Sequence, residues 1–213
     1  MPINKQDTIC APATIPGTGA ISVIRLSGPE ALSIANKVVT CNGTPLSSTD
    51  GYRIRYGTVL DNDGETVDNV LVSVFRAPHS YTGEDSAEIS CHASGYIVQT
   101  IIGLLLDAGA RSAGPGEFTR RAFVNGKMDL AQAEAVADVI AAQDKAAHRV
   151  AMNQLKGGYS KELGKLRAKL LKMTSLLELE LDFSEEDVEF ASRSEMSLLV
   201  NDVLHHVSTL ASS

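Results

Sequence analysis

The chain has 213 residues, of which 44% are hydrophobic and 21% charged, values typical of a globular protein with one large or two small domains. Only 5% of the residues are aromatic and tryptophan is absent, so we expect a core of leucine, isoleucine, valine and alanine. The net charge of -7 argues against a general nucleic-acid clamp, because phosphate binding needs clustered lysine and arginine; a local basic patch stays compatible with it.

The first half of the chain predicts a mixture of strands and helices. A β-rich run over 20–26 follows a Pro-Gly-Thr-Gly turn, and apolar residues at helical spacing follow over 29–39. Two predicted strands, 53–60 and 67–75, flank the sequence Asp-Asn-Asp-Gly, which is a hairpin signal. This half therefore contains at least one antiparallel strand pair.

A further strand and a helix complete the predicted α/β half. Residues 86–91 alternate between polar and small or apolar side chains, as a half-buried strand does. Residues 96–108 are apolar and free of turn signals, which predicts a helix. The Ala-Gly-Pro-Gly sequence at 113–116 then ends the half, and we place a domain boundary between residues 118 and 119.

The second half, 119–213, reads as all-helical. An alanine-rich stretch over 129–150 has no glycine or proline, and a Gly-Gly pair at 157–158 interrupts the helical pattern. Helical spacing returns over 163–181 and 194–210, with a break and helix N-cap expected at 184–187. The predicted fold class is thus α+β: an α/β domain over 1–118 followed by a helical domain.

Charge is polarised along the helical half. Residues 120–172 hold 11 Lys or Arg against 5 Asp or Glu, whereas 173–213 hold 1 against 9. Two antiparallel helices that pair opposite charges would explain this asymmetry. The alternative is that the basic stretch contacts an RNA backbone.

Cysteine usage and the lack of targeting signals bear on location. Cys10, Cys41 and Cys91 are odd in number and irregularly spaced, which indicates neither a disulfide framework nor a metal site. The sequence shows no signal peptide and no run of about 18 apolar residues. We expect a reduced, cytoplasmic protein without metal or membrane segment.

Two familiar catalytic patterns are excluded. Gly126-Lys127 resembles the end of a phosphate-binding P-loop, but Arg121 stands where its first glycine belongs and Met128 where a hydroxyl must bind magnesium. Cys91 and His92 are adjacent, yet neighbours on a strand point to opposite faces and do not make a catalytic dyad. No catalytic residue is predicted in this chain.

Three turn-rich segments remain, at 12–25, 78–92 and 114–134, and they carry a family likeness. The relevant strings are DTI and RLSG, SYTGED, and the near-continuous PGEFT, RAF, NGK, DL and QAEA, followed by DF and an acidic cluster from 182 onward. This set resembles the MnmE (TrmE) family of tRNA-modification GTPases from residue 7 to about residue 190. One minor departure is alanine and glycine at 113–114, where the family often has arginine before Pro-Gly-Glu-Phe.

The resemblance implies a function for the whole family protein. It implies an N-terminal domain like the tetrahydrofolate-binding fold of aminomethyltransferases, which forms a homodimer and binds 5-formyl- or 5,10-methylene-tetrahydrofolate. It also implies that the full family protein works with the FAD-dependent partner MnmG, and that the two together add an aminomethyl-type group to C5 of the wobble uridine of tRNA. The family's GTPase domain, which uses GTP with magnesium and potassium, is expected beyond this stretch, so we expect no GTPase activity from it.

The resemblance places Arg25, Glu88 and Lys127 at folate-contacting positions, and the residue types suit a folate. A carboxylate accepts the adjacent N–H donors of the pterin, for which Glu88 is the candidate and Glu84 the fallback. The anionic glutamate tail calls for cations, which Arg25 and Lys127 supply. Each of the three could instead be a solvated surface charge. Glu117 and Asn125 are further polar residues that could cap the turn and the helix beside it.

Two other readings stay open. The chain could be a stand-alone folate-dependent one-carbon transferase, although no residue stands out as its catalytic acid. It could also be a purely structural dimerisation module that ignores folate. Folate binding separates the structural module from both other readings.

Overall fold

Seven strands form one sheet in the order β3-β4-β5-β6-β2-β1-β7. Neighbouring strands are antiparallel except for β1 and β7, which are parallel. The computed structural model describes residues 7–182 and 193–211. The strands are β1 (Ile9–Pro12), β2 (Ile21–Ser27), β3 (Val39–Cys41), β4 (Arg53–Leu60), β5 (Thr66–Phe75), β6 (Ser86–His92) and β7 (Arg111–Ser112).

The β4–β5 hairpin forms as its sequence predicts. The Asp61 carboxylate accepts hydrogen bonds from the backbone N–H groups of Asp63, at 3.0 Å, and Glu65, at 2.8 Å. Gly64 takes a positive φ of 85°, which glycine adopts without steric cost. The turn chemistry therefore fixes the hairpin locally, and β4 has the predicted bounds.

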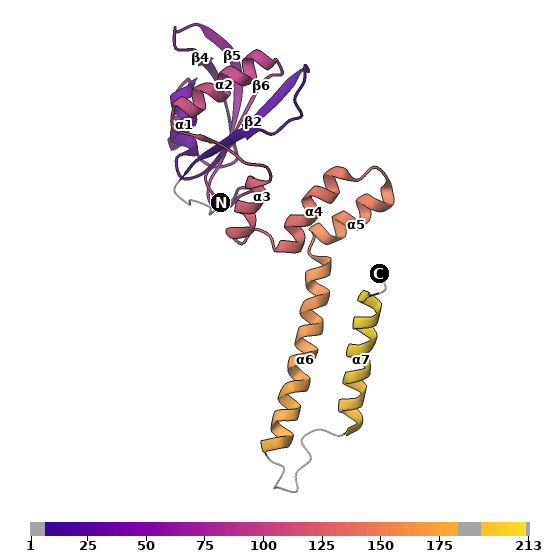
Figure 1. The fold of residues 1–213 in the computed structure, drawn as a ribbon. Coiled ribbons are helices and arrows are strands. Elements are labelled where there is room, and N and C mark those ends of the chain that lie inside the picture. Colours follow the sequence, from indigo (N-terminus) through magenta and orange to yellow (C-terminus); the bar gives the residue numbers. More distant parts are fainter. Residues whose placement is uncertain (1–6, 183–192, 212–213) are drawn as a thin grey trace. The chain divides into compact units, whose positions relative to one another are not determined.

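Helices α1 (Ala31–Val38) and α2 (Gly95–Asp107) contact the strands of this sheet and bury its core (Figure 1). Alternate residues of the central strands pack against them, as the period of a strand requires. The core side chains are aliphatic or sulfur-containing, as composition predicts: Cys10, Ile24, Leu26, Leu32, Ile34, Leu46, Val59, Val70, Val72, Val74, Ile89, Ile101 and Leu105 among others.

The other face of the sheet is partly apolar and exposed. Its side chains include Ile21 on β2, Ile54 and Tyr56 on β4, and Leu71 on β5, with exposures between 47% and 67%. Tyr56 lies directly across from Leu71 in the antiparallel register. A sheet with one solvated face normally carries polar residues there, so this apolar content indicates an interaction surface.

Several short elements have no counterpart in the sequence prediction. They are β1, β3, β7 and helix α3 (Glu117–Val124), and each has eight residues or fewer. Helix α3 begins after Gly116, whose φ of 67° lies in the left-handed region, so the glycines that suggest an interruption in fact start a helix. Strands of two to four residues are too short to show periodicity.

The chain divides into two compact units, Met1–Met128 and Asp129–Ser213. The division follows α3, ten residues after the boundary that the sequence suggests, and the suggested boundary falls inside that helix. Helix α3 belongs to the first unit because Arg121 and Asn125 bond to other parts of that unit.

The alanine-rich stretch at 129–150 forms two helices, which corrects the prediction of one continuous helical stretch. Helix α4 (Leu130–Ala141) starts with a capping box between Asp129 and Gln132. Helix α5 (Lys145–Leu155) starts at Asp144, whose carboxylate accepts the N–H groups of Ala146 and Ala147, both at 2.8 Å. Helix α4 thus ends at Ala141, where Ala142 is extended, and Asp144 begins the next helix, without glycine or proline.

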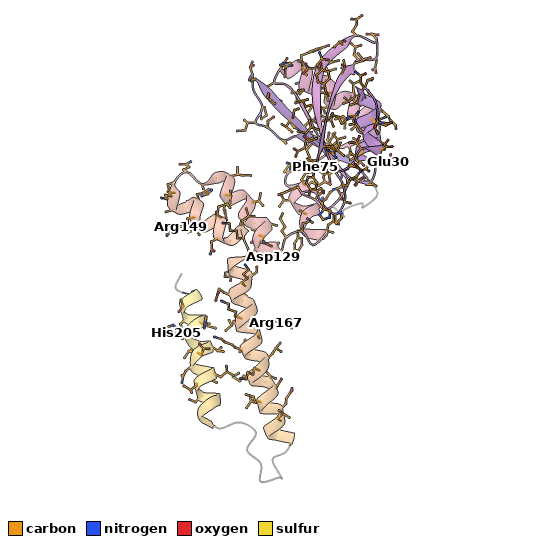
Figure 2. The ribbon with its side chains drawn as sticks, turned by 180° about the vertical axis from the view of Figure 1, so that it is seen from behind. Glu30, Phe75, Asp129, Arg149, Arg167 and His205 are labelled. Atoms are coloured by element: carbon orange, nitrogen blue, oxygen red, sulfur yellow. The ribbon has the colours of Figure 1, made fainter. Side chains whose placement is uncertain are left out.

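Helices α6 (Gly158–Asp182) and α7 (Arg193–Ala211) run side by side within the second unit (Figure 1). The Lys169 ammonium lies 2.5 Å from an Asp202 carboxylate oxygen, which joins the basic helix to the acidic one. This ion pair supports the helix-pairing interpretation of the charge asymmetry. Arg149 on α5 and Arg167 on α6 are nevertheless exposed (Figure 2). The break expected at 184–187 lies outside the described residues.

In the ranges 7–182 and 193–211, none of the helices combines the length and the apolar character needed to cross a bilayer.

Gly28, directly after β2, packs closely against the N-terminal segment at Asp7 and Thr8. A Cβ there would lie 2.7 Å from the Asp7 carbonyl oxygen and from Thr8, and φ is 141°. We expect Gly28→Ala to destabilise the protein by roughly 2–4 kcal/mol through this overlap and strain. Gly64→Ala, which meets no atom within 4 Å, should cost about 1 kcal/mol for its positive φ alone. Urea unfolding measures both, and equal effects would contradict the packing.

Candidate functional site

Arg25 and Glu88 form an ion pair on the exposed face of the sheet. They are direct neighbours in the β2–β6 register. Arg25 Nε donates to Glu88 Oε1 at 2.8 Å, and Arg25 Nη2 lies 2.8 Å from the same oxygen. Both side chains are 27% exposed, so the pair is half-buried and open to a ligand. A cross-strand pair of this kind is favourable, but its partial solvation limits its contribution to stability.

Two aromatic rings flank the Arg25 guanidinium. Its central carbon lies 5.2 Å from the centroid of the Tyr81 ring and 5.6 Å from that of Phe118. Both distances fall within the range of a cation–π interaction. Tyr81 comes from the loop before β6 and Phe118 from the first turn of α3, so the pair sits where these two segments meet the sheet.

Lys127 follows the end of α3 and contacts the loop at 77–85, which also carries Tyr81. Its Nζ donates to the Pro78 carbonyl oxygen at 2.9 Å. Its aliphatic stem packs close to Gly83, where a Cβ would lie 3.2 Å from the Lys127 Cγ. Asn125 holds the same loop by donating its amide to the Thr82 carbonyl at 2.8 Å. The loop at 77–85 therefore contacts Lys127 and, through Tyr81, also Arg25.

This geometry changes one part of the site hypothesis. The residue types predict that Glu88 binds the pterin and Arg25 the glutamate tail, which are the two ends of a long molecule. In the structure the Arg25 and Glu88 side chains bond to each other, so they act at one place. Lys127 contacts neither of them directly in the described part of the chain.

A buried arginine, Arg121 on α3, is a functional-looking residue that the sequence argument missed. Its side chain is fully buried and lies within 3.3 Å of three carboxylates, those of Asp7, Glu84 and Glu117. Arg121 also donates to the Asp7 carbonyl oxygen at 3.0 Å. Arg121 is the first residue of the Arg-Ala-Phe string, but only the fold shows that its side chain faces inward.

The Arg121 cluster has a second cation at its edge. Arg111 on β7 forms hydrogen bonds to Glu117 at 2.7 and 3.1 Å and to Asp7 at 2.8 Å. Glu117 also accepts the Gly114 backbone N–H at 2.8 Å, so it caps the turn, whereas helix α3 has no side-chain cap hydrogen bond. Glu84, the fallback for the pterin contact, is engaged by Arg121 and by the Ser27 hydroxyl. It is therefore a structural carboxylate more than a free ligand contact.

The charges of this cluster shift the pKa values of its carboxylates. Hydrogen bonds from Arg111, above all, lower the pKa of Glu117 to about 2, although its burial acts in the opposite direction. Burial would also raise the pKa of Asp7, but hydrogen bonds from Arg111 and Arg121 outweigh it and lower that pKa. Both carboxylates are thus ionised at neutral pH and balance the buried guanidinium.

Cys91 and His92 separate to opposite faces of β6, as expected. Cys91 is buried, and burial raises the pKa of its thiol to about 11. The His92 ring is exposed and its Nδ1 lies 2.8 Å from Asp68, a nearly buried carboxylate on β5. The two residues form no dyad. Within the described residues, no group of three or more histidine, cysteine or acidic side chains is arranged to hold a metal ion.

Two open hollows lie near the Arg25–Glu88 pair. One of about 670 Å³ is next to the loop at 77–85, and another of about 290 Å³ lies on the exposed sheet face. The first is lined by Pro29, Ala77, Gly83, Glu84, Asp85, Val124 and Asn125; the second by Ala20, Ile21, Tyr56, Asn69, Val70, Leu71, Ser90, Cys91 and His92. Neither of these two linings includes Arg25 or Glu88.

The architecture is that of an α+β domain, with a charged and aromatic site at one end of its sheet, followed by a helical unit. Comparison with known protein families gives the same two parts. Residues 8–127 match the family described as "GTP-binding protein TrmE N-terminus", and residues 130–213 match the family described as "MnmE helical domain".

Individual relatives agree. The chain is 56% identical over 211 residues to the tRNA modification GTPase MnmE of Bacteroides fragilis, covering 98% of this chain and 45% of that protein. It is 52% identical over 211 residues to the protein of the same name from Parabacteroides distasonis, covering 98% of this chain and 46% of the relative. The Flavobacterium johnsoniae relative is 55% identical over 200 residues, which cover 93% of this chain and 43% of that protein.

These matches establish that the chain belongs to the MnmE (TrmE) family, with an N-terminal domain and a helical domain of that family in sequence. It spans about half the length of the curated relatives it matches. Those full-length relatives are named as GTPases that modify tRNA.

The Glu117 carboxylate should make stability depend on acid pH. Its folded pKa of about 2 lies below the ordinary value of 4.5, so its contribution is present above about pH 4.5 and is lost as pH falls toward 2. The loss should be about 3 kcal/mol. We expect Glu117→Gln to be less stable at pH 7 and to have a flatter acid dependence.

Urea unfolding between pH 7 and pH 3 makes this measurement. Glu65→Gln, at an exposed position beside the hairpin turn, is the matched control and should follow the wild-type curve. Parallel pH curves for wild type and Glu117→Gln would show that the Arg111–Glu117 interaction does not set the acid stability.

Proposed function

We propose that this chain is the folate-binding and dimerising part of an enzyme that modifies tRNA. In the full-length protein, a GTPase domain that uses GTP with magnesium and potassium would drive the reaction. Together with the FAD-dependent MnmG, it would install a carboxymethylaminomethyl or aminomethyl group at C5 of the wobble uridine. The one-carbon unit would come from 5,10-methylene-tetrahydrofolate, in the cytoplasm. The names of the relatives support the tRNA and GTPase parts of this proposal.

One observation carries the folate part: the Arg25–Glu88 ion pair on an exposed sheet face. Glu88 Oε1 accepts both contacts from Arg25, and no contact of Oε2 is found among the described residues. A free, ionised carboxylate oxygen is the acceptor that the N–H donors of a pterin require. Lys127, across the loop at 77–85, supplies a positive charge for the glutamate tail.

The openness of the site supports a homodimer. Arg25 and Glu88 lie on a surface that also exposes Ile21, Tyr56 and Leu71. A ligand-binding ion pair gains strength when water is excluded, and apolar side chains favour association with another surface. We therefore propose that a second copy covers this face and closes the folate site. The exposed basic residues of the helical unit, among them Arg149 and Arg167, are compatible with a role for tRNA.

Calorimetric titration of the 213-residue chain with 5-formyl-tetrahydrofolate tests the proposal. We expect saturable binding by the wild type. Glu88→Gln should weaken it at least tenfold, because it removes the anionic acceptor and leaves the Arg25 charge unpaired. Glu65→Gln is the control and should bind within twofold of wild type.

The alternatives correspond to different outcomes of this titration. A folded, dimeric wild type that does not bind folate would contradict the proposal and leave a structural dimerisation module. Unchanged binding by Glu88→Gln would place the folate elsewhere. Hydrolysis of GTP by the 213-residue chain is not expected.

A further inference from the structure

We propose that Tyr81 and Phe118 form an aromatic clamp that holds Arg25 in the one position from which it orients Glu88 toward the ligand. The inference rests on the proposed folate function and names two positioning residues for that site. Neither ring has to touch the ligand for this role.

The clamp is defined by its geometry. The Arg25 guanidinium carbon lies 5.2 Å from the Tyr81 ring centroid and 5.6 Å from the Phe118 ring centroid, so both rings attract the same cation. The rings come from separate segments, the loop before β6 and helix α3. The third neighbour, Glu88, comes from the adjacent strand. Three elements therefore converge on one guanidinium.

Such convergence matters because arginine is flexible and this one is partly solvated. A half-exposed arginine on a sheet face has many rotamers, and ordering it costs conformational entropy. Here Arg25 Nε and Nη2 both lie 2.8 Å from Glu88 Oε1. This arrangement requires the guanidinium to keep one fixed orientation. The described contacts leave Glu88 Oε2 as a free acceptor and Arg25 Nη1 as a free donor. A pterin edge, with N–H donors beside a carbonyl oxygen, suits both atoms.

Substitutions of Tyr81 can separate the contribution of its aromatic ring from that of its hydroxyl group. Its hydroxyl is 2.9 Å from the Thr119 hydroxyl, which joins the loop to α3. The Asn125 amide makes a second, independent link from the end of α3 to the Thr82 carbonyl. Removal of the Tyr81 hydroxyl alone should therefore leave the loop in place and the ring over Arg25.

The test measures 5-formyl-tetrahydrofolate binding by calorimetry for matched pairs of variants of the 213-residue chain. Tyr81→Leu and Phe118→Leu remove a ring, and each should weaken binding about five- to tenfold. Tyr81→Phe and Phe118→Tyr keep the ring and should bind within twofold of wild type. Tyr96→Leu and Phe123→Leu are controls at exposed aromatic positions on α2 and α3, and should also bind as wild type.

Comparison of single and double variants shows whether the two rings affect folate binding through Arg25. If the rings act through Arg25, then Tyr81→Leu should weaken binding no further in a chain that already carries Arg25→Ala. Independent, multiplying effects would show that Tyr81 acts in some other way and would overturn the clamp.

The outcomes distinguish this inference from the function on which it rests. Absence of folate binding by the wild type would refute the function and the clamp together. Wild-type binding that is lost in Glu88→Gln but retained in both leucine variants would refute the clamp alone. Urea unfolding confirms that each variant is folded, and if Phe118→Leu does not fold, the Leu and Phe variants of Tyr81 still decide the question.

Discussion

The buried guanidinium of Arg121 is the interaction on which the first unit depends most. It joins three chain segments, and its carboxylate partners are Asp7 before β1, Glu84 in the loop at 77–85 and Glu117 on α3 itself. Removing one partner of a buried, hydrogen-bonded charge costs about 3–5 kcal/mol, far more than an exposed ion pair contributes. The cluster is not fully satisfied, since the buried Arg121 Nε has no hydrogen-bond partner.

The Arg121 cluster positions the residues of the proposed folate site. It fixes helix α3, which brings Phe118 to Arg25, and it holds Glu84 in the loop that carries Tyr81. Asn125 and Lys127 then tie the far end of α3 to the same loop. The Arg25–Glu88 pair lies on the rigid central strands, while the side chains around it come from α3 and the loop. The proposed site therefore lies where a buried charge cluster meets an exposed sheet face.

The sequence predicts those features that local chemistry decides. The β4–β5 hairpin follows from Asp61 and Gly64, and the strand bearing Glu88 follows from simple alternation. Helix α3 and the Asp144 break escape prediction because glycine and alanine permit more than one backbone path there. The contact between Arg25 and Glu88 depends on strand register between residues 63 positions apart, and the Arg121 cluster on a separation of 114. Such long-range pairings leave no periodic signal, so the sequence offers the individual residues as candidates but does not predict their grouping, and their role in folate binding stays a prediction.

The most direct test of this account is a crystal structure of the chain with bound 5-formyl-tetrahydrofolate. The account predicts the pterin on the exposed sheet face, its N–H donors on Glu88 Oε2, and Arg25 still held between Tyr81 and Phe118. It also predicts that a second copy covers the ligand and that the glutamate tail points toward Lys127. Density for the ligand elsewhere, or a guanidinium that leaves the two rings when the ligand binds, would contradict it.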